Sequence, residues 1–309
     1  MRDTILFGDC RDTLKQFDEK ARMCVTSPPY YGLRDYGGED SQIGQEQTPE
    51  EFIDELVKVF REVKNVLTDD GTCWVNVGDS YYNYRPGRGQ GLVKQTVSNT
   101  KQDLPDLCPR RGNKLDGLKE KDLIGIPWMF AFAMRADGWY LRQDIIWHKP
   151  NPMPESVKDR CTKSHEYIFL FSKNKKYYYD NEAIKEPAKD WGTRDRTNGK
   201  YHNEGTGLSP HTGLSKSYPT KNKRSVWSVT NKPYKGAHFA VYPPDLIEPC
   251  ILAGSEKGDI VLDPFMGSGT TAMVAKKNSR AYLGCELNKD YASLISDRLS
   301  TIPNKLPLY

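Results

Sequence analysis

Short apolar runs alternate with a clear helical pattern in the first part of the chain. The runs at 4–10 and 21–27 end in polar or turn residues, as buried parallel strands do. Between 49 and 67 the apolar residues recur at helical spacing, and Thr48 followed by a proline provides a helix start. Another apolar run follows at 72–78. This order of strand, helix and strand predicts an α/β fold with a parallel sheet.

The later part of the chain continues the alternation around two segments that lack periodicity. Residues 84–121 and about 185–235 are rich in Gly, Lys, Arg and Asn, which indicates loop-rich insertions. The regular elements predicted here are a helix from 126, strands at 140–150 and 165–173, a helix after Pro243, and a strand, turn, helix and strand over 260–287.

Charge is unevenly distributed along the chain, although the net charge of the 309 residues is only +4. The segment from Lys149 to Lys235 holds 18 Lys and Arg against 9 Asp and Glu, whereas the rest holds 27 against 32. A basic segment in a mildly acidic chain indicates a polyanionic partner. A lysine-rich solvated surface is the alternative.

The seven cysteines are scattered, with no Cys-x-x-Cys pair and no histidine at ligand spacing. They are typical of reduced thiols in a cytosolic protein rather than of a disulfide framework or a metal site. The first residues become charged too soon for a signal peptide, and no apolar run has the length of a membrane span. We therefore expect a soluble, cytoplasmic protein that holds no metal and meets no membrane.

The stretch Asp-Pro-Phe-Met-Gly-Ser-Gly-Thr-Thr at 263–271 is the clearest cofactor signal. It joins a predicted strand to a predicted helix, where glycines let the backbone approach a ligand. Glu286 ends the next strand about twenty residues later, where a carboxylate can bind both hydroxyls of a ribose. The turn lacks a P-loop lysine and a third glycine, so it favours a nucleoside without pyrophosphate. An ordinary crossover with a glycine turn is the alternative.

Thr-Ser-Pro-Pro-Tyr at 26–30, together with 263–271, resembles the amino-methyltransferases that methylate exocyclic amines of DNA bases with S-adenosylmethionine. The catalytic motif precedes the cofactor motif, as in the permuted class β of that family. The resemblance implies a doubly wound, mostly parallel methyltransferase sheet made from both chain ends. It also implies a catalytic half at 1–173, a target-recognition insertion at 174–237 and a cofactor-binding half at 238–309.

The resemblance also implies roles for individual residues. The Ser27 hydroxyl and the Pro28 carbonyl would accept the two hydrogens of the target amine, Pro29 would stiffen the loop, and Tyr30 would hold the extruded base. The expected cofactor-binding residues are Asp9, Thr26, His238, Phe239, Pro243, Asp263, Pro264, Phe265, Gly267, Ser268, Gly269, Thr270, Thr271, Glu286 and Asn288. The alternative to cofactor binding for Asp9 is a solvent-exposed aspartate in a turn. The alternative for His238, Phe239 and Pro243 is a core segment that leads into a helix.

Double-stranded DNA is the expected partner, and a homodimer and a restriction endonuclease that acts on the same site are further candidates. The expected DNA-binding residues are Arg85, Arg88, Arg110, Arg111, Lys175, Lys176, Lys221, Lys223 and Arg224. Within the family, serine at the first motif position is associated mainly with cytosine-N4 enzymes, so we expect methylation of cytosine N4 rather than adenine N6. Two further hypotheses are a protein-glutamine or RNA methyltransferase and an inactive DNA-binding module.

Overall fold

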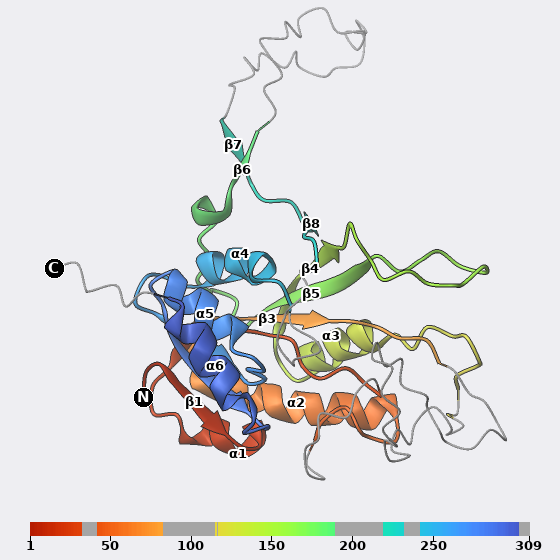
Figure 1. The fold of residues 1–309 in the computed structure, drawn as a ribbon, viewed down its shortest axis with the longest axis horizontal. Helices are drawn as coiled ribbons and strands as arrows, with labels where there is room; N and C mark the ends of the chain where they lie inside the picture. The colour runs from red at the N-terminus through yellow and green to blue at the C-terminus, as the bar shows by residue number, and fades with distance from the viewer. Residues whose placement is uncertain (33–41, 83–114, 116, 189–218, 232–241, 303–309) are drawn as a thin grey trace, which may run out of the picture.

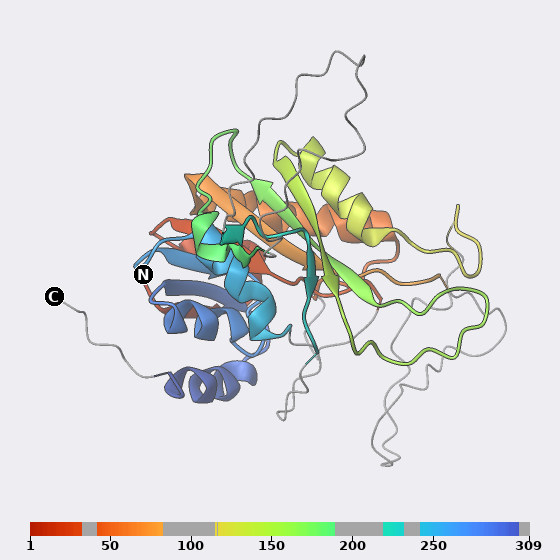
Figure 2. The same cartoon turned by 90° about the horizontal axis from the view of Figure 1, so that it is seen from above.

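The computed structural model describes residues 1–32, 42–82, 115, 117–188, 219–231 and 242–302. Its centre is an eight-stranded sheet with helices on both faces (Figures 1 and 2). The strands lie in the order β1 (Thr4–Phe7), β10 (Ala281–Glu286), β9 (Ile260–Asp263), β2 (Ala21–Thr26), β3 (Leu67–Val77), β5 (His165–Ser172), β4 (Tyr140–His148) and β8 (Val226–Ser228). Both ends of the chain therefore build one sheet.

The first five strands of this order are parallel to one another. β5 is antiparallel to both of its neighbours, and β8 is parallel to β4. The expected doubly wound, mostly parallel sheet is confirmed. The connection from β2 leads to β3 on one side, whereas that from β9 leads to β10 on the other. The boundary between β9 and β2 is thus a topological switch point, where open α/β sheets bind ligands beyond the carboxyl ends of their strands.

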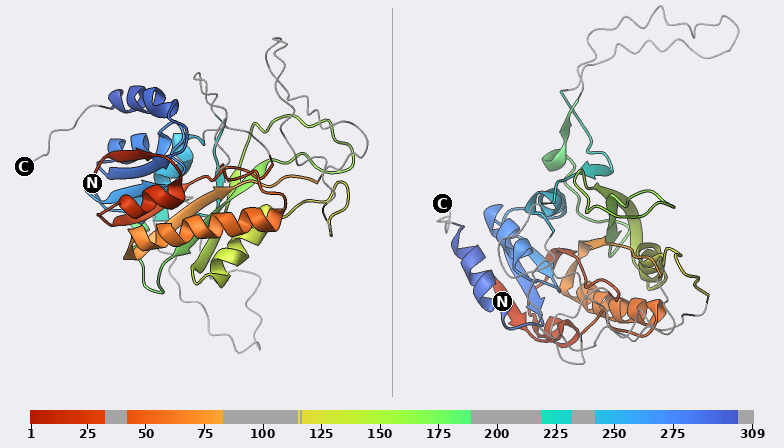
Figure 3. Two further views of the ribbon diagram at one scale, coloured as in Figure 1. Left: turned by 90° about the horizontal axis from the view of Figure 1, so that it is seen from below. Right: turned by 45° about the vertical axis from the view of Figure 1, so that its right-hand side comes forward.

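Each face of the sheet is covered by its own helices, because alternate residues of a strand point to opposite faces. α2 (Pro49–Val66) and α3 (Ile126–Ala136) cover one core, which includes Cys24, Phe169 and Leu262. α4 (Pro244–Gly254), α5 (Thr270–Lys277) and α6 (Tyr291–Ser300) cover the other, which includes the neighbouring strand residues Val25, Leu170 and Val261. The two sets of helices lie on opposite sides of the sheet in Figure 3.

The remaining short elements are α1 (Cys10–Thr13), η1 (Leu14–Gln16), η2 (Glu182–Ile184) and the two-stranded ribbon of β6 (Glu186–Pro187) and β7 (Thr220–Lys221). The ribbon projects away from the main sheet (Figure 1). β8, like β6 and β7, lies within the predicted target-recognition insertion at 174–237. Unlike them, it joins the edge of the main sheet beside β4. α6 was not predicted from the sequence.

The local sequence explains where the long helix begins. Thr48 and Glu51 form a capping box, in which the Thr48 hydroxyl accepts from the Glu51 amide and the Glu51 carboxylate accepts from the Thr48 amide. Pro49 occupies the first turn, and the residues that face the sheet include Phe52, Leu56 and Phe60, all fully buried. No helix in the described ranges is long and apolar enough to cross a membrane.

Candidate active site

The switch point brings the two sequence motifs into direct contact. Thr26 ends β2 and Asp263 ends β9. The Thr26 hydroxyl donates a hydrogen bond of 2.5 Å to Asp263 Oδ1, although the two residues are 237 positions apart in the sequence. Both residues are about 1% exposed. The catalytic loop that starts at Ser27 and the glycine turn that follows Asp263 therefore leave the same edge of the sheet from adjacent strands.

The Asp263 carboxylate organises this junction. Its Oδ1 also accepts from the Phe265 amide at 3.0 Å, and its Oδ2 accepts from the Thr271 hydroxyl at 2.5 Å and the Tyr242 hydroxyl at 3.1 Å. Burial raises the pKa of Asp263, although these hydrogen bonds act in the opposite direction. Because both oxygens accept from the protein, Asp263 joins β2, the glycine turn, α5 and the start of α4.

Tyr242 is a part of the junction that the sequence did not reveal. Burial and the neighbouring Asp263 charge raise the pKa of its phenol, and its hydroxyl also contacts the Thr271 hydroxyl. The available signal was its position directly before Pro243, which is buried and caps α4. His238 and Phe239, expected nearby, lie outside the described residues.

The glycine turn has the backbone conformation that a close ligand contact requires. Gly267 and Gly269 have φ values of 56° and 81°, in the left-handed region that favours glycine. A Cβ on Gly269 would lie 3.3 Å from Ile295 of α6. Pro264 and Phe265 precede these glycines, and Thr270 and Thr271 begin α5. The turn therefore packs closely on one side against α6 and carries the amino end of α5.

Ser268 provides a direct test of whether the turn fits a cofactor. Its hydroxyl is buried, and no residue in the described part of the chain gives it a hydrogen-bond partner. Buried polar atoms without a partner are uncommon, and a polar group of a bound ligand would supply the partner that this hydroxyl lacks. The turn at the switch point thus fits the nucleoside cofactor that the sequence predicts.

Glu286 lies beside the same turn, at the end of β10. The Gly267 amide donates to its Oε2 at 2.7 Å, and the Asn288 amide donates to its Oε1 at 2.8 Å. Burial raises the pKa of Glu286, and these amides act to lower it. The side chain is 8% exposed. Backbone groups therefore fix the carboxylate at the rim of the turn, where a ribose was expected to bind.

Asp9 lies at the same edge, after β1, which pairs with β10. Its carboxylate caps α1 by accepting from the Arg11 amide at 2.8 Å, and it pairs with the Arg11 guanidinium, which also contacts Glu55 at 2.5 Å. Burial acts to raise the pKa of Asp9, but the hydrogen bonds and charge of Arg11 outweigh it and lower the pKa. Asp9 is thus an ion-paired helix cap two strands from the switch point, and its contact with a cofactor stays a prediction.

The catalytic loop leaves β2 with Pro28 buried and with Ser27, Pro29 and Tyr30 half-buried. The Tyr30 hydroxyl donates to Glu166 Oε2 at 2.7 Å. A Cβ on Gly78 would lie only 2.6 Å from Tyr30 Cε2, so the ring rests directly on the backbone that follows β3. The loop and the ring are therefore held by contacts from β3 and β5, none of which the sequence predicted.

The expected DNA-binding residues are not gathered at one place. Lys175 and Lys176 follow the carboxyl end of β5, which is antiparallel and therefore ends at the edge opposite the catalytic loop. Since β5 has 8 residues, about 26 Å of strand separates the two edges. Lys223 and Arg224 both pair with Glu186 of the projecting ribbon, at 3.7 and 3.3 Å. Lys221 lies in β7 of that ribbon, and Arg85, Arg88, Arg110 and Arg111 lie outside the described residues.

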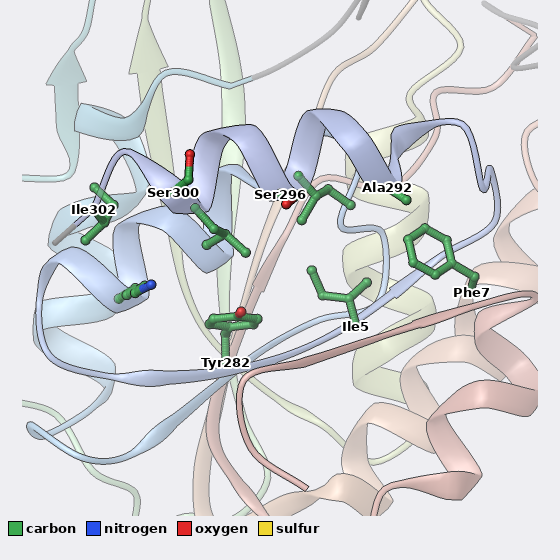
Figure 4. Close-up of a pocket in the computed structure, with 10 residues that line it drawn as sticks. Ile5, Phe7, Tyr282, Ala292, Ser296, Ser300 and Ile302 are labelled. Carbon is green, nitrogen blue, oxygen red and sulfur yellow. The ribbon is translucent and has the colours of Figure 1, made fainter. Parts of the chain in front are cut away.

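A cavity of about 560 Å³ lies away from both motifs (Figure 4). It is lined by α6, by Ile5 and Phe7 of β1, by Tyr282 of β10 and by Lys276 of α5. None of the predicted site residues lines it. The cavity is a gap beneath α6 at the sheet edge, and it is distinct from the site at the switch point.

Comparison with known proteins gives clear matches over nearly the whole chain. The family model of N6/N4 methyltransferases, described as DNA methylase, matches residues 21–297. The chain is 47% identical over 301 residues to the Type II methyltransferase M.XycI of Xanthomonas campestris pv. cyanopsidis, covering 97% of this chain and 88% of that protein. It is 46% identical over 296 residues to the Type II methyltransferase M.SmaI of Serratia marcescens, covering 96% and 90%.

Solved structures share the fold at lower identity. The cytosine-N4-specific PvuII DNA methyltransferase matches with a TM-score of 0.62 and 18% identity, covering 99% of this chain and 88% of that one. M1.HpyAVI, solved as its complex with SAM, matches with a TM-score of 0.54 and 18% identity, covering 96% and 99%. At these identities the likeness concerns the fold.

Proposed function

Because the chain belongs to the N6/N4 family of DNA methylases, we propose that it transfers a methyl group from S-adenosylmethionine to the N4 amine of a cytosine in DNA. The family expected from the sequence is confirmed, and with it a DNA amino-methyltransferase that uses S-adenosylmethionine. The observation that carries the proposal is the Thr26–Asp263 hydrogen bond, which joins the Ser27 loop to the glycine turn. The choice of cytosine rests on serine at position 27.

The amine of cytosine is a poor nucleophile because its lone pair is delocalised into the ring. Two acceptors that bind its hydrogens favour the localised lone pair, and we assign this role to the Ser27 hydroxyl and the Pro28 carbonyl at the end of β2. Pro28 and Pro29 restrict the loop and donate no backbone hydrogen bond, so the carbonyl needs no reordering when the base binds. Serine can accept one amine hydrogen while its own proton rotates away.

Bound S-adenosylmethionine would supply the activated methyl group. The residues that would hold it are the backbone of Gly267 and Gly269, the Ser268 hydroxyl and the Glu286 carboxylate, with Glu286 accepting from ribose hydroxyls. The contacts of Asp263 favour a positioning role for that residue, since its two oxygens already accept four hydrogen bonds within the protein. Thr26 would act through Asp263 in the same way.

The target base must leave the duplex to reach this loop. We assign its aromatic neighbour to Tyr30, whose ring packs against the Gly78 backbone after β3. Sequence recognition is proposed for residues 174–237, from which the β6–β7 ribbon projects. We assign that role to Lys221, Lys223 and Arg224 of this segment rather than to Lys175 and Lys176, which follow β5 at the edge opposite the catalytic loop.

We also propose that the enzyme acts in the cytoplasm beside a restriction endonuclease that cuts the same site. The relatives M.XycI and M.SmaI are named Type II methyltransferases, which supports this pairing. Light scattering of the purified chain would test the predicted homodimer.

Nucleoside analysis tests the proposed reaction. DNA incubated with the enzyme and S-adenosylmethionine is digested to nucleosides and separated by mass spectrometry. We expect N4-methylcytosine, and we expect none from the Ser27→Ala variant, which keeps its affinity for the cofactor. If N6-methyladenine is the product, the base assignment is wrong while the amine mechanism remains. If methyl groups enter only protein or RNA, the proposed substrate is wrong.

A further inference from the structure

Tyr30 is held at its hydroxyl by a carboxylate on a distant strand. Its O–H donates to Glu166 Oε2 at 2.7 Å, across 136 residues of sequence. The Asn76 amide donates to the same oxygen at 3.1 Å and to the Tyr167 carbonyl at 3.1 Å. The Tyr30 hydroxyl also lies 3.5 Å from Asn76 Oδ1, but a phenol has a single proton to donate, and the shorter contact assigns that proton to Glu166.

Lys149 fixes the other half of this carboxylate. Its ammonium pairs with Glu166 Oε1, and the two side chains are only 17% and 13% exposed. The ammonium also lies 4.2 Å from the centroid of the Trp147 ring. A shielded ion pair contributes little net stability, because desolvation offsets the attraction, but it orients both partners. The carboxylate therefore presents Oε2 to Tyr30 in one orientation.

The ring of Tyr30 is constrained at a second place. Gly78 leaves room for it, since a Cβ there would lie 2.6 Å from Cε2 and 3.0 Å from Cζ. A tyrosine side chain has two rotatable angles that place its ring. With the hydroxyl bound to Glu166 and the ring against the Gly78 backbone, both angles are determined.

We propose that Glu166 is a positioning residue for methyl transfer, which holds the ring of Tyr30 in place as the wall against which the extruded base stacks. Lys149 is its counter-ion and Asn76 its second donor. The inference rests on the proposed function, since it requires a base beside Tyr30. It assigns the Tyr30 hydroxyl a mechanical task and leaves the stacking to the ring.

A double-mutant cycle tests this assignment. The variants are Glu166→Gln, Tyr30→Phe and the combination of the two, and all three keep the ring. The matched control is Glu248→Gln on α4, because Glu248 also pairs with a lysine, Lys277 at 3.3 Å, but lies in the helical layer away from the catalytic loop. Calorimetry with S-adenosylmethionine checks that each variant is folded and binds the cofactor.

Two readouts separate positioning from general damage. The first is the single-turnover rate of methyl transfer on a duplex with a mapped target site, at saturating cofactor. The second is the fluorescence of 2-aminopurine at the target position, which rises when the base leaves the stack. Tyr30→Phe removes a hydrogen bond to a charged group, and Glu166→Gln leaves a neutral acceptor that no longer forms the ion pair with Lys149. We therefore expect each single variant to react up to about tenfold more slowly. The fluorescence rise should be smaller too, at unchanged cofactor affinity.

The combined variant decides the outcome. If Glu166 acts through the Tyr30 hydroxyl, the double variant is no slower than Tyr30→Phe alone, because without the hydroxyl the side chain at position 166 holds nothing in place. Losses that multiply to about a hundredfold would mean independent roles and would overturn the proposal. A Glu166→Gln rate within twofold of Glu248→Gln would overturn it as well. The test compares rates of methyl transfer, so it holds for either methylated base. A wild-type enzyme that methylates no DNA would refute the proposed function rather than the role of Glu166.

Discussion

Replacing Gly78 by alanine isolates the placement of the Tyr30 ring. The new Cβ would lie 2.6 Å from Tyr30 Cε2, whereas carbon atoms in contact are about 3.5–4.0 Å apart. The ring must therefore move by roughly 1 Å, and that movement strains the 2.7 Å bond from its hydroxyl to Glu166. The backbone at Gly78 has no positive φ, so alanine itself fits the chain.

A shift of about 1 Å in a substrate-positioning group can lower a rate roughly a hundredfold. We expect Gly78→Ala to slow single-turnover methyl transfer by about 10- to 100-fold while leaving the affinity for S-adenosylmethionine within a factor of about two. The cofactor turn is on β9 and β10, two and three strands away from β3, which is why its affinity should be preserved.

Gly258→Ala is the matched control. Gly258 has a φ of 86° with open space around the position of a Cβ, and it lies before β9 at the edge opposite the catalytic loop. Alanine there should lower the free energy of unfolding by about 1 kcal/mol without slowing methyl transfer. If Gly78→Ala reacts within threefold of wild type, the ring is not held where its contacts place it, and the stacking role of Tyr30 loses its structural basis.

Three further outcomes are expected. Ser268→Ala should leave urea unfolding unchanged, because the Ser268 hydroxyl makes no hydrogen bond within the described residues, but should weaken S-adenosylmethionine binding by about five- to tenfold in calorimetry. The pKa of Asp9 in the folded protein is lowered below its ordinary 3.8, so the ionised carboxylate stabilises the fold above that pH. Asp9→Asn should therefore lower the free energy of unfolding by about 1 kcal/mol at pH 7. The difference between the variant and wild type should vanish as the pH falls through the lowered pKa. Glutamine at Lys221, Lys223 and Arg224 should reduce the slope of log affinity for DNA against log salt by about 0.9 for each phosphate that the protein no longer neutralises, and a slope already flat in the wild type would mean that this surface is only solvated.

The sequence determined those parts of the protein that depend on near neighbours in the chain. The helix at Pro49–Val66 follows from its apolar spacing and its Thr48 cap, and the strand, turn and helix from 260 to 277 follow from an apolar run and two glycines. The family followed from two short motifs and their order. Such signals are readable because helix periodicity, capping and left-handed glycines are local requirements.

Local patterns were weaker where an element is only lightly buried. α6 was not expected, and Ile295 is its single buried residue, so its apolar stripe is narrow. β8 is three residues long and exposes two of them, and its place at the sheet edge depends on β4. An element whose stability comes mainly from its neighbours leaves little trace in its own sequence.

Only the tertiary structure decided how the site is assembled. Thr26 and Asp263 meet across 237 residues, and Tyr30 and Glu166 across 136, because strand order places their ends at one edge. The antiparallel direction of β5 brings Glu166 to that edge and carries Lys175 and Lys176 to the other, which a count of charges along the chain could not foresee. Strand order and direction are set by pairing between distant segments, and a site built where strands end inherits that dependence.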